Sequence, residues 1–101
     1  MQADLDKTYK VSYPDDSNPL RHRDENLGKM NYIEATNVAR RWIKDHANVF
    51  IWDGSSQIFG VDPTGVRLIN STIDHPHYQE HLKIKIELDR AWSENRIRYF
   101  Q

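Results

Sequence analysis

The sequence contains no cysteine. This absence excludes a disulfide scaffold, a zinc site built from thiolates and a cysteine nucleophile. Any metal site would have to use other ligands. A chain without thiols also suits a reducing compartment, and we expect the protein to be cytoplasmic.

Long apolar runs are also missing. The longest run, Val49–Trp52, is far shorter than the roughly 20 residues that a membrane-spanning helix needs. The first residues, Met1–Asp6, are polar and acidic and lack the apolar region of a signal peptide. We therefore expect a soluble protein without a membrane partner.

Glycine is scarce, and its positions match none of the common phosphate-binding or hydrolase motifs. The four glycines are dispersed and form no G-x-G-x-x-G, no P-loop pattern and no G-x-S-x-G. The formal net charge is -1, so no strong field draws the chain to nucleic acid or acidic lipid. Nucleic acid is therefore a less favoured partner than another protein.

The length of 101 residues corresponds to one domain. Near the start, Lys7–Tyr13 alternates and predicts an edge strand. Residues 14–26 are rich in Pro, Asp, Ser, Asn and charged side chains, which predicts a loop. We therefore expect a loosely ordered N-terminal segment at residues 1–30 and an α+β core domain at residues 31–101.

A helix is expected directly after this segment. Asn31 and Glu34 have the spacing of a capping box, and the helix should end near residues 46–48. Its apolar stripe, at helical spacing, consists of Ile33, Val38, Ala39, Trp42 and Ile43.

Three β-rich runs come next, at Val49–Trp52, Gln57–Val61 and Val66–Ile69. Asp53-Gly54 is typical of a tight hairpin turn, and Asp62–Gly65 carries Pro and Gly at favoured turn positions. The three runs predict a mostly antiparallel meander. The expected core consists of Trp42, Ile43, Phe50, Trp52, Phe59 and Trp92.

The last third of the chain has two interpretations. Leu82–Leu88 alternates, which favours a strand, but its good helix formers and lack of Gly and Pro favour a helix. We predict a long helix with Pro76 in its first turn and Asp74 or His75 as its cap. Residues 96–100 predict a terminal strand whose aromatic residues favour pairing with a partner or a homodimer.

Together these elements predict the fold class. We expect an α+β fold: a small single domain with a three- to five-stranded, mostly antiparallel meander sheet packed against two helices.

Three of the five histidines fall within residues 74–81. In a helix, His77 and His81 lie one turn apart on one face, which is the spacing that two imidazole ligands need. Glu80 lies beside them. Asp74 or His75 is available as a third ligand, or as an acceptor that orients an imidazole.

The letters H-x-x-E-H at residues 77–81 resemble the signature of the inverted zinc peptidases. The resemblance covers those five positions and implies Zn²⁺, Glu80 as the base, and a distal carboxylate such as Glu87 or Glu94. Peptidases with this signature are much larger than this chain. A solvated polar helix start is therefore the simpler interpretation, and we expect no cofactor, with Zn²⁺ as the alternative.

Basic and aromatic residues interleave elsewhere in the sequence, as in surfaces that bind phosphates and stacked bases. Acidic neighbours interrupt every such run, however. The candidate interaction residues are Trp52, Arg40, Arg41, Lys44, Arg98, Tyr99 and Phe100.

No complete catalytic constellation is present, so we predict a non-enzymatic protein-binding domain that acts as an adaptor, inhibitor or regulator. Two alternatives remain. One is a metal-binding or metal-dependent hydrolytic domain built on His77, Glu80 and His81. The other is a nucleic-acid-binding module that uses the interleaved basic and aromatic residues.

Overall fold

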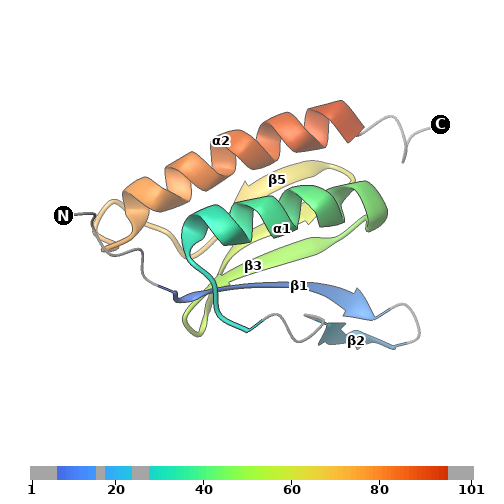
Figure 1. The fold of residues 1–101 in the computed structure, drawn as a ribbon, viewed down its shortest axis with the longest axis horizontal. Helices are drawn as coiled ribbons and strands as arrows, with labels where there is room; N and C mark the ends of the chain where they lie inside the picture. The colour runs from blue at the N-terminus through green and yellow to red at the C-terminus, as the bar shows by residue number, and fades with distance from the viewer. Residues whose placement is uncertain (1–6, 16–17, 24–27, 96–101) are drawn as a thin grey trace.

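Two helices lie side by side on one face of a five-stranded antiparallel sheet (Figure 1). The computed structural model describes residues 7–15, 18–23 and 28–95. The spatial order of the strands is β2–β1–β3–β4–β5. The predicted α+β fold class is confirmed. In chain order the elements are β1 (Tyr9–Asp15), β2 (Asn18–Arg23), α1 (Tyr32–Asp45), β3 (Val49–Asp53), β4 (Ser56–Asp62), β5 (Gly65–Leu68) and α2 (Tyr78–Asn95).

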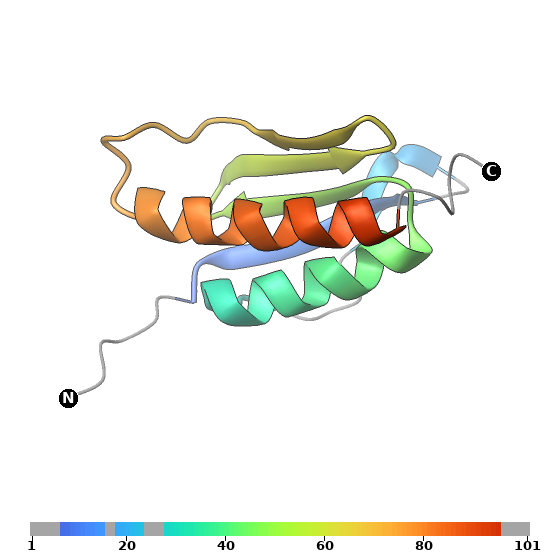
Figure 2. The same cartoon turned by 90° about the horizontal axis from the view of Figure 1, so that it is seen from above.

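The helices form one layer and run in the same direction (Figure 2). Lys83 Nζ on α2 lies 5.8 Å from the centre of the Tyr32 ring on α1. Further along, Arg40 Nη1 on α1 is 3.9 Å from Glu87 Oε1 on α2. The N-terminal ends of both helices therefore lie together, at the end of the molecule where β3 turns into β4.

Strand β1 lies inside the sheet. It pairs with β3 through Tyr9–Ser12 and with β2 through Tyr13–Asp15, so the predicted edge strand has β2 as a second neighbour only at its end. Its alternation turns Tyr9, Val11 and Tyr13 into the core, where all three are buried. The predicted loop at residues 14–26 contains β2. The division of the chain at residue 30 stays a prediction.

Helix α1 begins as the sequence predicts. The Asn31 side chain accepts from Glu34 N at 2.8 Å, and the Glu34 side chain accepts from Asn31 N at 3.0 Å. This capping box is confirmed. Ile33, placed in the predicted apolar stripe, is 47% exposed, so the buried stripe starts at Ala35. The buried residues of α1 are Ala35, Thr36, Val38, Ala39, Trp42 and Ile43.

The sheet has one face covered by the helices and one face that they leave open. Along β3, Val49, Ile51 and Asp53 are buried, whereas Phe50 and Trp52 between them are half-buried. Of the predicted core, Trp42, Ile43 and Phe59 are confirmed. Trp92 packs against the core but keeps part of its surface exposed, whereas Phe50 and Trp52 are half-buried on the other face of the sheet, so their placement in the core is wrong.

Two of the partly exposed tryptophans donate hydrogen bonds through the indole N–H. Trp92 Nε1, at the rim of the core, donates to the Asp62 carbonyl at 2.8 Å. Trp52 Nε1 donates to Ser12 Oγ at 3.1 Å on the open face of the sheet. Each indole N–H therefore has a polar partner.

The segment around Leu82–Leu88 is helical, as predicted. Ile84, Leu88 and Ala91 recur at helical spacing and are buried against the sheet and α1. Helix α2 begins at Tyr78, two residues later than the predicted first turn at Pro76. His75 accepts hydrogen bonds from His77 N and Tyr78 N in the turn before it.

The predicted terminal strand at residues 96–100 lies outside the described residues. Within residues 7–15, 18–23 and 28–95, no helix has the length and apolar character to cross a membrane.

The capping box predicts a measurable share of the stability. Asn31→Ala removes the acceptor for Glu34 N–H and should lower the free energy of unfolding by about 1 kcal/mol. Asn37→Ala, at an exposed position of the same helix, is the control and should leave stability unchanged or slightly raised, because alanine is the better helix former. Urea denaturation measures both. Equal losses in the two variants would contradict the capping role.

Candidate metal centre

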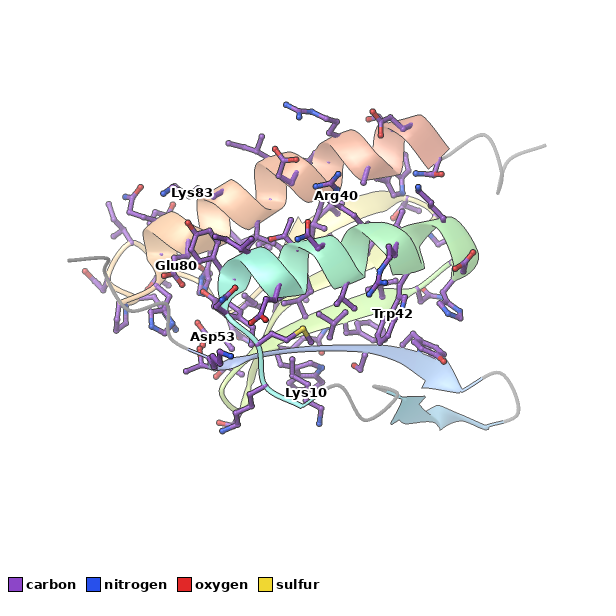
Figure 3. The ribbon with its side chains drawn as sticks, in the orientation of Figure 1. Lys10, Arg40, Trp42, Asp53, Glu80 and Lys83 are labelled. Atoms are coloured by element: carbon purple, nitrogen blue, oxygen red, sulfur yellow. The ribbon has the colours of Figure 1, made fainter. Side chains whose placement is uncertain are left out.

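One carboxylate and three imidazoles meet where β3 turns into β4. They belong to Asp53, His75, His77 and His81, and one ligand atom from each lies within 4.8 Å of the others. We call this group the Asp53 cluster. Figure 3 labels Asp53 and, at the same end of the molecule, Glu80 on the first turn of α2. Nitrogen and oxygen donors at this spacing are the kind that first-row metal ions use.

The position of Asp53 follows from the β3–β4 hairpin. Asp53 is the last residue of β3, alternates onto the helix side and is 8% exposed. Thr8 Oγ1 donates to its Oδ1 at 2.6 Å, and the Thr8 carbonyl accepts from Gly54 N at 2.8 Å. Gly54 has a φ of 64°, which suits the tight two-residue turn after Asp53. One carboxylate oxygen is thus held by the residue before β1, and Oδ2 faces α2.

His77 and His81 both contact this second oxygen. His77 Nδ1 is 2.7 Å and His81 Nε2 is 2.9 Å from Asp53 Oδ2. The backbone N–H of His81 donates to the His77 carbonyl at 2.9 Å, so the first turn of α2 spaces the two rings. The rings therefore face the same point, as their sequence spacing predicts.

His75 approaches from the turn before α2. Its backbone N–H donates to the Thr72 carbonyl at 2.8 Å, and its carbonyl accepts from Tyr78 N at 3.0 Å. Its Nδ1 accepts from the backbone N–H of His77 at 2.9 Å. This folded turn leaves His75 Nε2 4.0 Å from Asp53 Oδ2, beyond hydrogen-bonding distance.

Ser71 completes the surroundings of His81. Its Oγ lies 2.7 Å from His81 Nδ1, and the His81 side chain is fully buried. If Nε2 carries the proton and donates to Asp53, Nδ1 accepts from the Ser71 hydroxyl. If Nδ1 carries the proton and donates to Ser71, the lone pair of Nε2 faces the centre of the cluster. Ser71 can serve either tautomer.

Glu80, a predicted metal residue, has a different partner. Its Oε1 accepts from the Tyr9 hydroxyl at 2.7 Å, and Glu80 is not one of the four clustered groups. The Tyr9 ring is fully buried, and its centre lies 6.0 Å from those of the His77 and His81 rings. Burial raises the pKa of Tyr9 well above its usual range, and the hydrogen bond to Glu80 adds to the shift. Tyr9 is therefore a neutral donor that occupies one oxygen of the Glu80 carboxylate.

The cluster also sets the charges of its members. Burial alone would raise the pKa of Asp53, but hydrogen bonds from Thr8, His81 and His77 hold it below its ordinary value. Burial lowers the pKa of His81, although the nearby Asp53 opposes that shift. Near neutral pH the cluster therefore combines an ionised carboxylate with a neutral buried imidazole, which are the protonation states that metal ligands need.

The candidate interaction residues do not form one surface. Trp52 lies on the open face of the sheet, whereas Arg40, Arg41 and Lys44 belong to α1 on the opposite side. Arg98, Tyr99 and Phe100 lie outside the described residues.

The basic residues of α1 border a groove of about 540 Å³ that mixes acidic and basic side chains. The groove therefore lacks the uniformly positive character of a phosphate-binding surface. Its lining residues are Glu34, Asn37, Arg40, Arg41, Lys44, Ala91, Glu94 and Asn95.

Asp53 is the member of the cluster that the sequence reasoning missed. Asp53-Gly54 is a common hairpin pair, and this turn role alone accounts for an aspartate there. Its register indicates a role beyond the turn, because Asp53 occupies the third inward position of β3, after Val49 and Ile51. Ser71 and Thr8 carry no comparable sequence signal.

Comparison with known proteins found no matching family model, no matching curated protein and no matching solved structure. The geometry of the Asp53 cluster is therefore the basis on which function has to be argued.

The lowered pKa of His81 predicts how the stability of the metal-free protein depends on pH. The native state binds a proton at His81 less readily than the unfolded chain, so stability falls as the pH drops below the unfolded value of about 6.5. Between the unfolded pKa and the lower folded pKa of His81, the free energy of unfolding should fall by at most about 1.4 kcal/mol per pH unit. Asp53 adds a further loss at more acidic pH, as the pH falls through its own lowered pKa.

Urea denaturation between pH 7 and pH 5 in the presence of a chelator measures this dependence. The His81→Gln variant should show a flatter dependence than the wild type. His46→Gln is the matched control, because His46 stacks on Tyr13 at the C-terminal end of α1, and this variant should keep the wild-type slope. Identical slopes in wild type and His81→Gln would refute the assignment.

Proposed function

We propose that the chain is a small metal-binding domain that holds a first-row transition metal ion, with Zn²⁺ the first candidate, at the Asp53 cluster. One observation carries this proposal. A buried carboxylate oxygen, Asp53 Oδ2, has imidazole nitrogens of His77 and His81 within 2.9 Å and that of His75 at 4.0 Å.

The donor set favours this class of ion over others. Imidazole nitrogen suits zinc, copper, iron and nickel, whereas Mg²⁺ and Ca²⁺ prefer sites built from oxygen. Zinc bonds of about 2.0–2.1 Å in a tetrahedral arrangement place neighbouring ligand atoms about 3.3 Å apart. His77 Nδ1 and His81 Nε2 lie 2.7 and 2.9 Å from Asp53 Oδ2, so shifts of a few tenths of an ångström would admit the ion.

A stabilising role fits the surroundings better than the hydrolase alternative. The H-x-x-E-H interpretation requires Glu80 as the base on metal-bound water. The Glu80 carboxylate instead accepts from the Tyr9 hydroxyl, and it is not one of the four clustered groups. An ion at the Asp53 cluster would join the β3–β4 hairpin to α2 and the turn before it. Such a link would stabilise the folded state. A domain of 101 residues has a small apolar core, so the free energy of metal binding would be a useful addition to its stability.

Protein binding, the function favoured by the sequence, stays a second candidate. Among the described residues, the large apolar side chains that are exposed are Ile33, Ile69, Ile73 and Ile86, and they belong to α1, the segment after β5 and α2. Apolar side chains of this kind mark a partner's binding site where they form a contiguous patch. The cytoplasmic location and a homodimer also stay predictions.

Calorimetric titration with Zn²⁺ tests the proposal. The wild type should bind one equivalent with micromolar or better affinity, while His77→Ala should weaken binding by about 100-fold or more, since a lost ligand costs more than the 10–100-fold of a lost supporting contact. Asp53→Asn keeps the shape of the side chain but removes its charge and should also weaken binding strongly. Saturating Zn²⁺ should raise the thermal midpoint of the wild type, because the ion binds the folded chain in preference.

Two variants serve as controls for this titration. His46→Ala removes a histidine distant from the cluster, and Glu80→Gln replaces the side chain that contacts Tyr9, so both should bind Zn²⁺ like the wild type. Circular dichroism verifies that each variant is folded. Millimolar affinity in the wild type, or equal affinity in a His77→Ala/His81→Ala double variant, would disprove the metal site.

A further inference from the structure

We propose that the ion at the Asp53 cluster has three protein ligands and one open coordination position that accepts a small anion beside His75. The ligands are Asp53 Oδ2, His77 Nδ1 and His81 Nε2. This inference rests on the proposed function and adds to it the ligand number and the chemical class of the exogenous ligand.

The hydrogen bond at His75 Nδ1 excludes this residue from the ligand set. The backbone N–H of His77 always carries a proton, and it donates to His75 Nδ1 at 2.9 Å. His75 Nδ1 must therefore present its lone pair to that N–H, so in the neutral ring the proton is on Nε2. The nitrogen that faces Asp53 then has no lone pair for a metal ion. His75 becomes a ligand only if the turn before α2 loses this bond.

The nitrogens of His77 and His81 that face Asp53 can present a lone pair to a metal ion. Ser71 Oγ, 2.7 Å from His81 Nδ1, accepts from that nitrogen in the tautomer that turns the Nε2 lone pair inward. His77 Nδ1 already points at Asp53 Oδ2 from 2.7 Å. The opposite carboxylate oxygen, Oδ1, is occupied by Thr8, which orients Oδ2 towards the same point.

The exposure of the four side chains places the open position. The side chains of Asp53 and His81 are 5% and 0% exposed, whereas those of His77 and His75 are 17% and 26% exposed. The cluster is therefore closed on the core side and reaches solvent on the His75 side. A ligand that enters there meets His75 Nε2–H, a donor that lies 4.0 Å from Asp53 Oδ2.

Charge selects the class of ligand. A divalent ion with one carboxylate and two neutral imidazoles keeps a net charge of +1, and His75 adds a hydrogen-bond donor at the entrance. Small anions with a nitrogen or oxygen donor atom, such as azide, formate or hydroxide, satisfy both features. Metal sites with three protein ligands characteristically keep such an exchangeable position.

Cobalt replacement followed by azide titration tests the ligand number. Co²⁺ bound to the wild-type protein gives visible absorption bands whose position and intensity depend on its ligands. Azide should shift these bands in a saturable manner. His75→Asn should keep Co²⁺ affinity within about threefold, because asparagine can accept from a backbone N–H two residues on and so preserve the turn. The same variant should bind azide at least about threefold more weakly, because it lacks the Nε2–H donor.

The matched comparison is His77→Gln, which removes an inferred ligand from the neighbouring position and should lose Co²⁺ affinity by about 100-fold or more. Circular dichroism confirms that both variants are folded. The inference is overturned if azide leaves the wild-type bands unchanged, if His75→Asn binds azide as tightly as the wild type, or if His75→Asn loses as much Co²⁺ affinity as His77→Gln. The first result would mean that the site is closed to azide, the second that His75 has no role in anion binding, and the third that His75 is a fourth protein ligand. In each case, bound Co²⁺ would still support the proposed function. A wild type that binds no Co²⁺ and no Zn²⁺ would refute both proposals.

Discussion

The Oδ2 atom of Asp53 is the buried carboxylate oxygen that contacts two imidazoles at the start of the second helix. A buried ionised carboxylate is costly unless hydrogen bonds and charges compensate for its lost hydration. Thr8 satisfies one oxygen and two imidazoles satisfy the other, so every buried side-chain nitrogen and oxygen in the described parts of the chain has a partner. The tautomer of His81 in the metal-free protein and the low pKa of Asp53 both follow from this compensation.

The polar residues of the Asp53 cluster occupy inward positions that follow directly on those of the hydrophobic core. Val49 and Ile51 occupy the inward positions of β3, and Asp53 is the next inward position in the same row. On α2, Ile84 and Leu88 face the same interior, and His81 is the residue one turn before Ile84. The strand thus keeps its two-residue alternation and the helix its helical spacing. In both elements the inward-facing residues change from apolar to polar at the end nearest the β3–β4 hairpin. This change lets one rigid scaffold position both the core and the candidate site.

Local patterns in the sequence were sufficient for most elements but not for their tertiary neighbours. The capping box at Asn31, the hairpin at Asp53-Gly54 and the helix around Leu82–Leu88 depend on contacts within a few residues, and all three are present in the structure. The place of β1 between two strands and the contact of Asp53 with His81 are long-range properties. The sequence therefore indicated the three histidines of the cluster, and the carboxylate that faces them required the fold.

Hydrogen bonding and metal binding at this cluster need opposite protonation of the same nitrogen atoms. In the metal-free state His77 and His81 must donate protons to Asp53 Oδ2, whereas an ion requires their lone pairs. The hydroxyl of Ser71 lets His81 change tautomer without losing a hydrogen bond, because it donates to Nδ1 in one state and accepts from it in the other. His75 has no such freedom, because a backbone N–H can only donate. The difference between a rotatable hydroxyl and a fixed amide thus separates two histidines that lie in the same cluster and would otherwise be equivalent candidates for a metal ion.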